Sequence, residues 1–503
     1  MRLLRGFASV LLVATLILVG TFGVCSTEAQ AEGAVTITSV NIVGDAVVVN
    51  LTGGFPSEDG LYHLIASSAN ENAPKGMDVA AQGTYTTSFS VPLNKGGTNS
   101  LLYKKFTICV MAGGVLAPVS NSMFITNPEA CAPVAPARMD YGKKGILPEI
   151  DPTIANKNMI ADLGVTQVNI NLPISKISKL GAYDQLIQKY NSMGIQVTMI
   201  ILADKAAGKD YISPYSYNGM GKAHDYYAFN ASSEEALNRL GDAMAYVAQH
   251  YSNIGYGQVD NYIIGNEVNA WYKWNYMKAS SNDAIMAEYY KAFRVMYNGI
   301  KSANGSADVY TCIDHEWAYP EASYYISGKE FLVKFNTLVS SEGNIDWKLA
   351  THPNNAQLLN PRVWEASKYI THDQSTGYIS MVNLEVLTDF MCMPEMLSPS
   401  GEVRTIKLAE VGYPSNKGQE IQAASVAFAY YAAMNNQYVD GILILREADN
   451  SVEIAQGLAC GLCDKKGNPK MAYNFYKYAD DPSIMAQANA IAGVDLTTLI
   501  SPR

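Results

Sequence analysis

Two glutamates each come directly after a run of apolar residues. Glu267 ends the segment Asn261-Tyr-Ile-Ile-Gly-Asn-Glu267, and Glu410 ends the segment Ile406-Lys-Leu-Ala-Glu410. Short apolar runs bounded by turn residues are typical of buried strands. We therefore expect both carboxylates at strand ends, where they can face a shared site.

A pair of carboxylates at one site can cleave a glycosidic bond. In the retaining reaction one carboxyl protonates the leaving oxygen and the other attacks the anomeric carbon, across a separation of about 5 to 5.5 Å. Partial burial and the charge of its partner would raise the pKa of the acid. One strand-end glutamate alone is as often a surface or salt-bridged residue, but two in this arrangement favour catalysis.

The segments that must position these glutamates alternate with amphipathic helices, one of them predicted over residues 233–251 with Ser232 as its cap. Alternation of this kind indicates a parallel sheet with crossover helices. Eight strands are predicted, over residues 144–147, 167–172, 196–202, 259–265, 309–313, 347–350, 406–409 and 441–445.

Eight strands fit an α/β fold of the (β/α)8 TIM barrel type better than a doubly wound sheet. A doubly wound sheet normally carries a glycine-rich phosphate loop after its first strand, where this chain has Leu147-Pro148-Glu149. Active sites of barrels lie at the C-terminal ends of the strands. Glu267 follows the fourth strand and Glu410 the seventh, and we expect these strands to face each other across the barrel.

A small antiparallel β-sandwich is predicted before the barrel. Residues 35–40, 46–51 and 85–91 alternate between apolar and polar side chains, and glycine pairs separate such runs. The predicted domains are a signal peptide over 1–31, the sandwich with its linker over 32–134, and the barrel over 135–503.

The first residues have the pattern of an export signal. Arg2 and Arg5 precede the apolar run Phe7–Val19, and Ala29-Gln30-Ala31 follows as a cleavage site. We expect a secreted or cell-surface protein without a membrane span in the mature chain. An uncleaved membrane anchor is the alternative.

Export would leave six cysteines in an oxidising compartment. Cys109 and Cys131 fall in the small domain and are candidates for a disulfide. The spacing of Cys460 and Cys463 predicts either a local disulfide or two free thiols. Cys312 is expected to be a small core residue. No metal and no cofactor are expected, because the six histidines lack ligand spacing.

The overall composition describes a large folded chain. Of 503 residues 48% are hydrophobic and 16% charged, which excludes a disordered chain, and the formal charge of −10 argues against binding to nucleic acid. The 33 tyrosines against 13 phenylalanines suit surfaces that hold polyhydroxylated ligands. Nothing in the composition predicts an oligomeric state.

The motifs around both glutamates resemble those of clan A glycoside hydrolases, which are retaining TIM-barrel enzymes. Gly265-Asn266-Glu267 is similar to their strand-four motif and Ala409-Glu410-Val411-Gly412 to their strand-seven motif. The resemblance, over about residues 138–480, implies that Glu267 is the acid/base, Asn266 binds the sugar 2-hydroxyl and Glu410 is the nucleophile. The chain also resembles an uncharacterised family of secreted bacterial barrel proteins, which supplies no substrate.

Polar residues at other strand ends are candidates for substrate binding. His315 follows the fifth strand and His352 the sixth, and either could orient the nucleophile or bind a hydroxyl. Asn169 and Asn171 share one face of the second strand and are expected to reach the pocket floor.

Aromatic loops and the eighth strand supply the remaining candidates. Trp271 and Trp274 follow the first catalytic motif and are expected to contact sugar rings, although packing between loops explains most of the nearby aromatics. Clan A barrels usually carry a tryptophan at the end of strand eight, where this chain has Arg446 and Glu447. These two are expected to pair with each other or to contact ligand.

The sequence therefore predicts a secreted retaining glycoside hydrolase that cleaves a polysaccharide or oligosaccharide by double displacement. The alternative is a noncatalytic glycan-binding barrel protein at the cell surface, motivated by the missing tryptophan. A transglycosylase is a third possibility. The sugar, the linkage and the role of the sandwich do not follow from the sequence.

Overall fold

The computed structural model describes residues 34–71, 78–133, 136–139, 141–149, 159–221, 223–253, 255–322, 324–365 and 369–503. The predicted signal peptide lies outside these residues. The chain divides into two compact units, Met1–Cys131 with Ser340–Gly343, and Ala132–Val339 with Asn344–Arg503. In the described residues, no helix has the length and hydrophobicity needed to cross a membrane.

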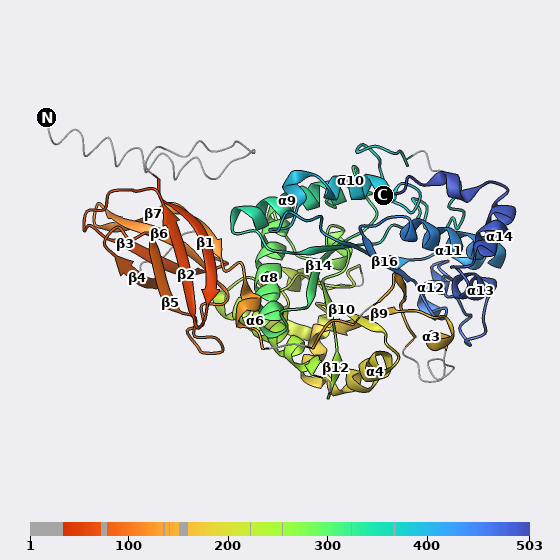
Figure 1. Ribbon diagram of the computed structural model, residues 1–503, viewed down its shortest axis with the longest axis horizontal. Helices are drawn as coiled ribbons and strands as arrows, with labels where there is room; N and C mark the ends of the chain where they lie inside the picture. Colours follow the sequence, from red (N-terminus) through yellow and green to blue (C-terminus); the bar gives the residue numbers. More distant parts are fainter. Residues whose placement is uncertain are drawn as a thin grey trace. The chain divides into compact units, whose positions relative to one another are not determined.

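The first unit holds two antiparallel sheets, which confirms the predicted sandwich (Figure 1). Alternate residues of the first two strands are buried, such as Val40, Ile42, Val47 and Val49. One sheet has the order β1-β2-β5 and the other β4-β3-β6-β7. The bounds are β1 Thr36–Val43, β2 Ala46–Thr52, β3 Tyr62–Ser68, β4 Val79–Gly83, β5 Ser88–Pro92, β6 Lys104–Ala112 and β7 Val115–Phe124.

The predicted disulfide in this unit is wrong. Cys109 is buried inside β6, and the thiol of Cys131 instead donates to the Pro128 carbonyl at 3.2 Å. All six cysteines in the described part of the chain are free thiols, Cys460 and Cys463 included.

The second unit contains a closed barrel of eight parallel strands, which confirms the predicted TIM barrel (Figure 1). Each predicted segment forms one strand of the ring, because apolar β-branched runs buried on both faces suit a parallel sheet covered by helices. The strands are β8 Lys144–Ile146, β9 Gln167–Pro173, β10 Gln196–Leu202, β13 Asn261–Ile264, β14 Asp308–Ile313, β15 Lys348–Thr351, β16 Ile406–Val411 and β17 Val439–Ile444.

Helices surround this ring (Figure 1). The longer ones are α4 Gly181–Ser192, α6 Glu234–His250, α8 Asn282–Ala303, α9 Gly328–Ser341, α10 Leu384–Met391, α11 Gln419–Met434, α13 Met471–Lys477 and α14 Pro482–Ala492. Short helices are α3 Met159–Asp162, α5 Gly208–Tyr211, α7 Trp271–Trp274 and α12 Ser451–Ala455, and β11 Ser252–Asn253 pairs with β12 Gly257–Gln258. The cap of α6 is Ser233, whose hydroxyl accepts from the Ala236 amide at 3.2 Å, and not Ser232 as predicted.

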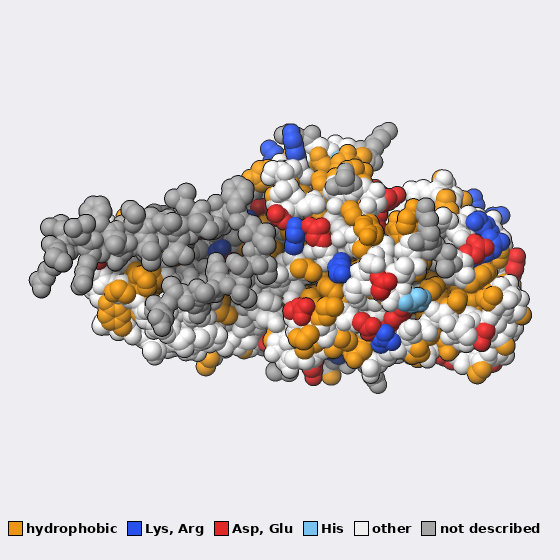
Figure 2. Space-filling view, turned by 90° about the horizontal axis from the view of Figure 1, so that it is seen from above, with side chains coloured by type: hydrophobic (Ala, Val, Ile, Leu, Met, Phe, Trp, Pro, Cys, Tyr) orange, Lys and Arg blue, Asp and Glu red, His pale blue; other side chains and the backbone are white. Residues whose placement is uncertain are grey.

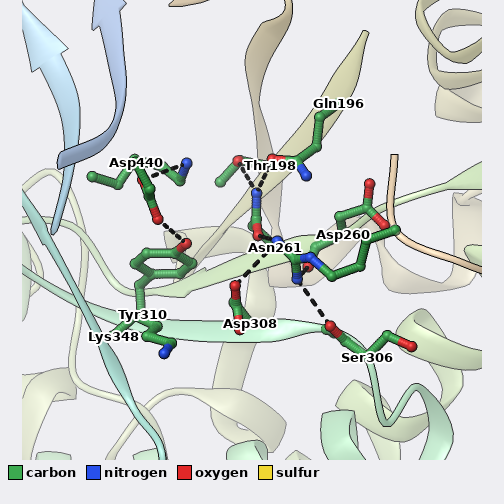
Figure 3. A network of polar contacts seen from close by, with 12 residues as sticks. Gln196, Thr198, Asp260, Asn261, Ser306, Asp308, Tyr310, Lys348 and Asp440 are labelled. Carbon is green, nitrogen blue, oxygen red and sulfur yellow. Dashed lines mark hydrogen bonds and ion pairs between the residues drawn. The ribbon is translucent and has the colours of Figure 1, made fainter. Parts of the chain in front are cut away.

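Polar side chains close the N-terminal end of the barrel (Figure 3). Asn261 donates to Gln196 at 2.7 Å and to Thr198 at 3.0 Å, and the Tyr310 hydroxyl donates to Asp440 at 2.7 Å. An apolar cluster made of Ile200, Leu202, Ile263, Tyr310, Cys312, Ala350 and Ala409 packs inside the ring. The interior is therefore filled, and the active site of such a barrel is expected at the C-terminal ends of the strands.

Candidate active site

Glu267 follows the fourth strand, β13, and Glu410 lies near the end of the seventh, β16. In the ring, β14 and β15 separate these strands on one side and four strands separate them on the other. The expectation that they face each other directly is therefore wrong, since opposite positions in a ring of eight are four steps apart. The shorter arc carries His315 after β14 and His352 after β15, which puts both histidines between the carboxylates.

The turn after β13 presents Glu267 in an uncommon backbone conformation. Gly265 has a φ of +82° and Glu267 a φ of +41°. A Cβ at Gly265 would lie 2.5 Å from the Val268 side chain, so only glycine fits there. The Glu267 carbonyl accepts from the Ala270 amide at 2.9 Å, which holds the turn. Such conformations cost about 1–3 kcal/mol and occur often at functional sites.

A bulge in β16 changes the direction in which the Glu410 side chain points. Ala409 belongs to the apolar cluster inside the barrel, so a regular strand would send Glu410 outward. The register with β17 shifts between Leu408 and Val411, which breaks the alternation. The side-chain amide group of Asn169, on β9, donates to the Ala409 carbonyl at 2.8 Å, and this hydrogen bond stabilises the bulge.

His352 bonds Glu267 and lies within electrostatic range of Glu410. Its Nδ1 donates to Glu267 Oε1 at 2.7 Å, its Nε2 lies 3.5 Å from the Cys312 sulfur, and the residue is 1% exposed. Burial alone would lower the pKa of His352, but Cys312, Glu410 and Glu267 outweigh it and raise that pKa well above its usual value. The surroundings of His352 therefore favour its protonated form beside Glu267.

The pKa values of the two carboxyls shift in opposite directions. Burial tends to raise the pKa of Glu267, but the hydrogen bond and charge of His352 bring it below its usual value. The pKa of Glu410 is raised by burial and by the charge of Glu267, against the opposing effect of His352. The expected raised pKa of Glu267 is wrong, because the expectation counted the second carboxylate and not the histidine.

The pKa values of the two histidines shift in opposite directions. Burial lowers the pKa of His315, although the nearby carboxylate of Glu267 opposes the shift. Its Nδ1 lies 3.2 Å from the Asn354 carbonyl, to which it donates. His315 is thus suited to accept or donate a hydrogen bond to a ligand, whereas His352 is committed to Glu267.

The predicted asparagines lie where the strand pattern puts them. Asn169 and Asn171 occupy one face of β9, but Asn169 is 1% exposed and bound to the Ala409 carbonyl, while Asn171 is exposed. Asn171 therefore lies at the open mouth and Asn169 below it. Asn266 is half-buried beside Glu267.

The aromatic loops pack on one another, as the simpler interpretation expected. The Tyr276 amide donates to the Tyr226 carbonyl at 3.1 Å, and Trp271 stacks on Tyr276 with ring centroids 6.5 Å apart. Trp274 stacks on Tyr226 at 5.9 Å, and Tyr226 packs against the apolar cluster of the barrel. Burial, Asp225, Asp204 and Glu410 raise the pKa of Tyr226, so this ring, which the sequence did not single out, lies near Glu410.

Arg446 pairs with Glu453 and not with Glu447. The Arg446 guanidinium donates to Glu453 at 2.6 Å, and both residues influence the pKa of Glu410. Glu447 is 1% exposed and accepts from the Glu149 amide at 2.8 Å. The predicted Arg446–Glu447 pair is therefore wrong, because each of the two side chains has a different partner.

Two further carboxylates at the end of β14 were not predicted as site residues. Asp314 accepts from Asn269 at 2.7 Å and from the Glu316 amide at 2.9 Å. Burial, with Glu321 and Glu267 nearby, raises the pKa of Glu316 to about 7. Asp314 lies two residues after Cys312 on the inward face of β14, a period-two signal that sequence inspection could have used.

No group of histidine, cysteine and carboxylate side chains in the described ranges could hold a metal ion. An open hollow of about 1040 Å³ lies outside the barrel along α6, and Tyr211, Arg239 and Tyr246 are among its lining residues. It contains none of the predicted site residues. Figure 2 shows acidic and basic side chains interspersed with apolar ones on the described part of the face it presents.

Comparison with known families and structures gives a family without an assigned activity. A model described as a family of unknown function (DUF5722) matches residues 176–498. No curated protein matches the chain.

Similar solved structures share little sequence with this chain. A family 39 glycoside hydrolase from Bacteroides cellulosilyticus WH2 aligns over 89% of this chain and 79% of its own, with 13% identity and a TM-score of 0.49. GH5_18 from Streptomyces cattleya in complex with GlcNAc aligns over 72% and 90%, with 14% identity and a TM-score of 0.45. A β-D-glucuronidase of Dictyoglomus thermophilum aligns over 88% and 68%, with 12% identity and a TM-score of 0.39.

Proposed function

Because the chain belongs to a family of unknown function, DUF5722, we propose its activity from its own side chains: it is a retaining glycoside hydrolase that cleaves O-glycosidic bonds in an oligosaccharide or polysaccharide. The observation that carries the proposal is the group of Glu267, His352 and Glu410 at one end of the barrel. His352 bonds one carboxylate and acts on the pKa of the other.

The proposed reaction has two displacements. Glu410 attacks the anomeric carbon, the bond to the leaving oxygen breaks, and Glu267 gives that oxygen a proton. Glu267 then takes a proton from a water molecule, whose oxygen displaces Glu410 and releases the sugar with its original configuration. Asn266 would bind the sugar 2-hydroxyl, and the Tyr226–Trp274 pair would lie against the ring near Glu410.

His352 supplies the proton that Glu267 needs. Since the pKa of Glu267 is lowered and that of His352 raised, the proton rests on the imidazole, 2.7 Å from Oε1. It can pass along that hydrogen bond as Glu267 protonates the leaving oxygen. Once Glu410 is an ester it carries no charge, and Glu267, no longer facing a second anion, serves as the base of the second step.

Azide rescue tests the two roles. Glu410→Ala should abolish hydrolysis of activated aryl glycosides, and added azide should restore turnover with a product of inverted configuration. Glu267→Ala with azide should give a product of retained configuration, because the nucleophile is intact. Glu402→Ala, at an exposed glutamate, is the matched control. Full activity of Glu410→Ala would reject the mechanism.

A noncatalytic glycan-binding protein is the second candidate, favoured by the lowered pKa of Glu267 and the raised pKa of Glu410. It requires glycan binding that Glu267→Gln leaves intact and no hydrolysis of any glycan in a broad panel. Export through residues 1–31 is part of either proposal, and the N-terminal sequence of the protein recovered from outside the cell tests it.

A further inference from the structure

Three tyrosines lead from the catalytic group to the surface. They are Tyr378, Tyr369 and Tyr319, here called the tyrosine wall. The Tyr378 ring meets His315 edge-on with centroids 5.1 Å apart, and Tyr369 meets Tyr378 at 5.9 Å. His315 is close enough to Glu267 for each to influence the pKa of the other. The wall therefore begins at His315, which lies within electrostatic range of Glu267.

The wall is held rigidly by backbone contacts between the loops after β14 and β15. Glu316 and Tyr378 form an antiparallel bridge, the Trp317 amide donates to the Gly377 carbonyl at 2.8 Å, and the Asn383 amide group donates to the Tyr378 carbonyl at 2.9 Å. A Cβ at Gly377 would lie 3.9 Å from the Tyr319 ring, which places that ring against the same loop. A preformed platform loses little entropy when it binds a ligand.

The three rings of the wall differ in their exposure to solvent. Tyr378 is half-buried, Tyr369 is 49% exposed and Tyr319 is 65% exposed. Packing within the protein therefore leaves much of the outer two rings open to solvent. Tyrosine combines an apolar face with a polar edge, which matches the C–H faces and hydroxyl edges of sugar rings.

Carboxylates lie beneath the wall. Burial raises the pKa of Tyr378, and the nearby charges of Glu316 and Glu321 add to the shift. Above pH 7, where Glu316 is ionised, a negatively charged sugar placed on this wall would be repelled by like charge. Neutral sugars would not be repelled by these carboxylates.

We propose that the tyrosine wall binds neutral sugar rings on the leaving-group side of the scissile bond, so that the substrate is a chain of uncharged sugars and not a uronic-acid polymer. This inference rests on the proposed function, because the acid that protonates the leaving oxygen is Glu267, and the wall starts at His315, within electrostatic range of that acid.

Calorimetric titration tests the wall without requiring turnover. The ligands are cello-, xylo-, manno- and laminarihexaose, with tetragalacturonate as the anionic comparison, and each is titrated into the full chain carrying Glu410→Gln. At least one neutral hexaose should bind more tightly than tetragalacturonate. Adding Tyr369→Ala or Tyr319→Ala should weaken that binding about tenfold, whereas Tyr369→Phe and Tyr319→Phe should stay within about twofold.

The matched control is Tyr246→Ala, since this tyrosine is 52% exposed on α6 outside the barrel. Equal binding by the Tyr369, Tyr319 and Tyr246 alanine variants would overturn the proposal, as would preferred binding of tetragalacturonate or no binding of any neutral hexaose. Wall-dependent binding without hydrolysis by the unmodified protein would reject the hydrolase and keep the wall. Hydrolysis by the unmodified protein, with binding that the wall variants do not weaken, would keep the hydrolase and reject the wall.

Discussion

The imidazole of His352 lies 2.7 Å from the carboxylate of Glu267, and the side chains come from strands that are not neighbours in the barrel. With Glu410 in electrostatic range, three ionisable groups share one site. With His352 protonated and both carboxyls ionised, the group carries a net charge of −1 and not −2, which makes the burial of the second carboxylate less costly. The pH dependence of the protein should report this arrangement.

His352→Gln should narrow the pH range of activity from both sides. The variant lacks the cation that lowers the pKa of both carboxyls. Glu410 then ionises at higher pH, which moves the acidic limb up. The proton of the acid is held by Glu267 alone, which loses it at lower pH than His352 with its raised pKa does, so the basic limb moves down. The profile of kcat/KM against pH on an aryl glycoside measures both limbs. His372→Gln, at a half-exposed histidine, is the control, and an unchanged profile in His352→Gln would contradict the shared proton.

Gly265→Ala should reduce activity more than tenfold and destabilise the fold by about 1–3 kcal/mol. The new Cβ would lie 2.5 Å from Val268 in a residue with positive φ, so the turn that presents Glu267 must shift. Gly194→Ala separates the two effects, because Gly194 also has a positive φ, of +73°, but nothing within 4 Å of the added atom. It should lose stability through strain and keep kcat/KM. Urea unfolding and steady-state kinetics give both quantities.

Glu447→Gln should make stability less dependent on pH. Burial raises the pKa of Glu447 to about 7, so the folded protein binds this proton more tightly than the unfolded chain does. The contribution is present in full below the unfolded pKa and is lost as pH rises through about 7. A tenfold difference in proton affinity between the folded and unfolded states corresponds to about 1.4 kcal/mol, so the change in stability between pH 5 and pH 8 amounts to a few kcal/mol at most.

The measurement is urea unfolding of both proteins at these two pH values. The glutamine can still accept from the Glu149 amide, so the hydrogen bond survives. Glu316 also has a pKa raised to about 7, and it contributes equally to both proteins. Parallel pH dependences of the two proteins would show that Glu447 keeps an ordinary pKa.

Lys407→Met should destabilise the protein by about 3–5 kcal/mol, because it leaves a buried carboxylate without its cation. Lys407 is fully buried, 2.9 Å from Asp440 Oδ1 and 2.8 Å from Gln167 Oε1. Lys407→Met with Asp440→Asn should recover part of the loss, since no buried charge remains. Thermal and urea unfolding measure both. A double variant no more stable than the single one would show that packing, and not charge, accounts for the effect.

The positions of the eight strands and of both glutamates could be predicted because they depend on patterns within short stretches of chain. A buried strand needs apolar residues over four to eight positions, and the turn at Gly265 needs a glycine, whatever surrounds it. The same holds for the place of Asn169 and Asn171 on one face of β9, since side chains alternate along any strand.

Only the tertiary structure decided which charges meet. Three outcomes depend on how segments far apart in the sequence are placed in space, which hydrophobic periodicity does not specify. They are the pairing of His352 with Glu267, the pairing of Arg446 with Glu453, and the absence of a disulfide between Cys109 and Cys131. Because electrostatic effects on pKa depend on those distances and on burial, the directions of the shifts at Glu267 and Glu410 followed from the assembled barrel and not from either motif.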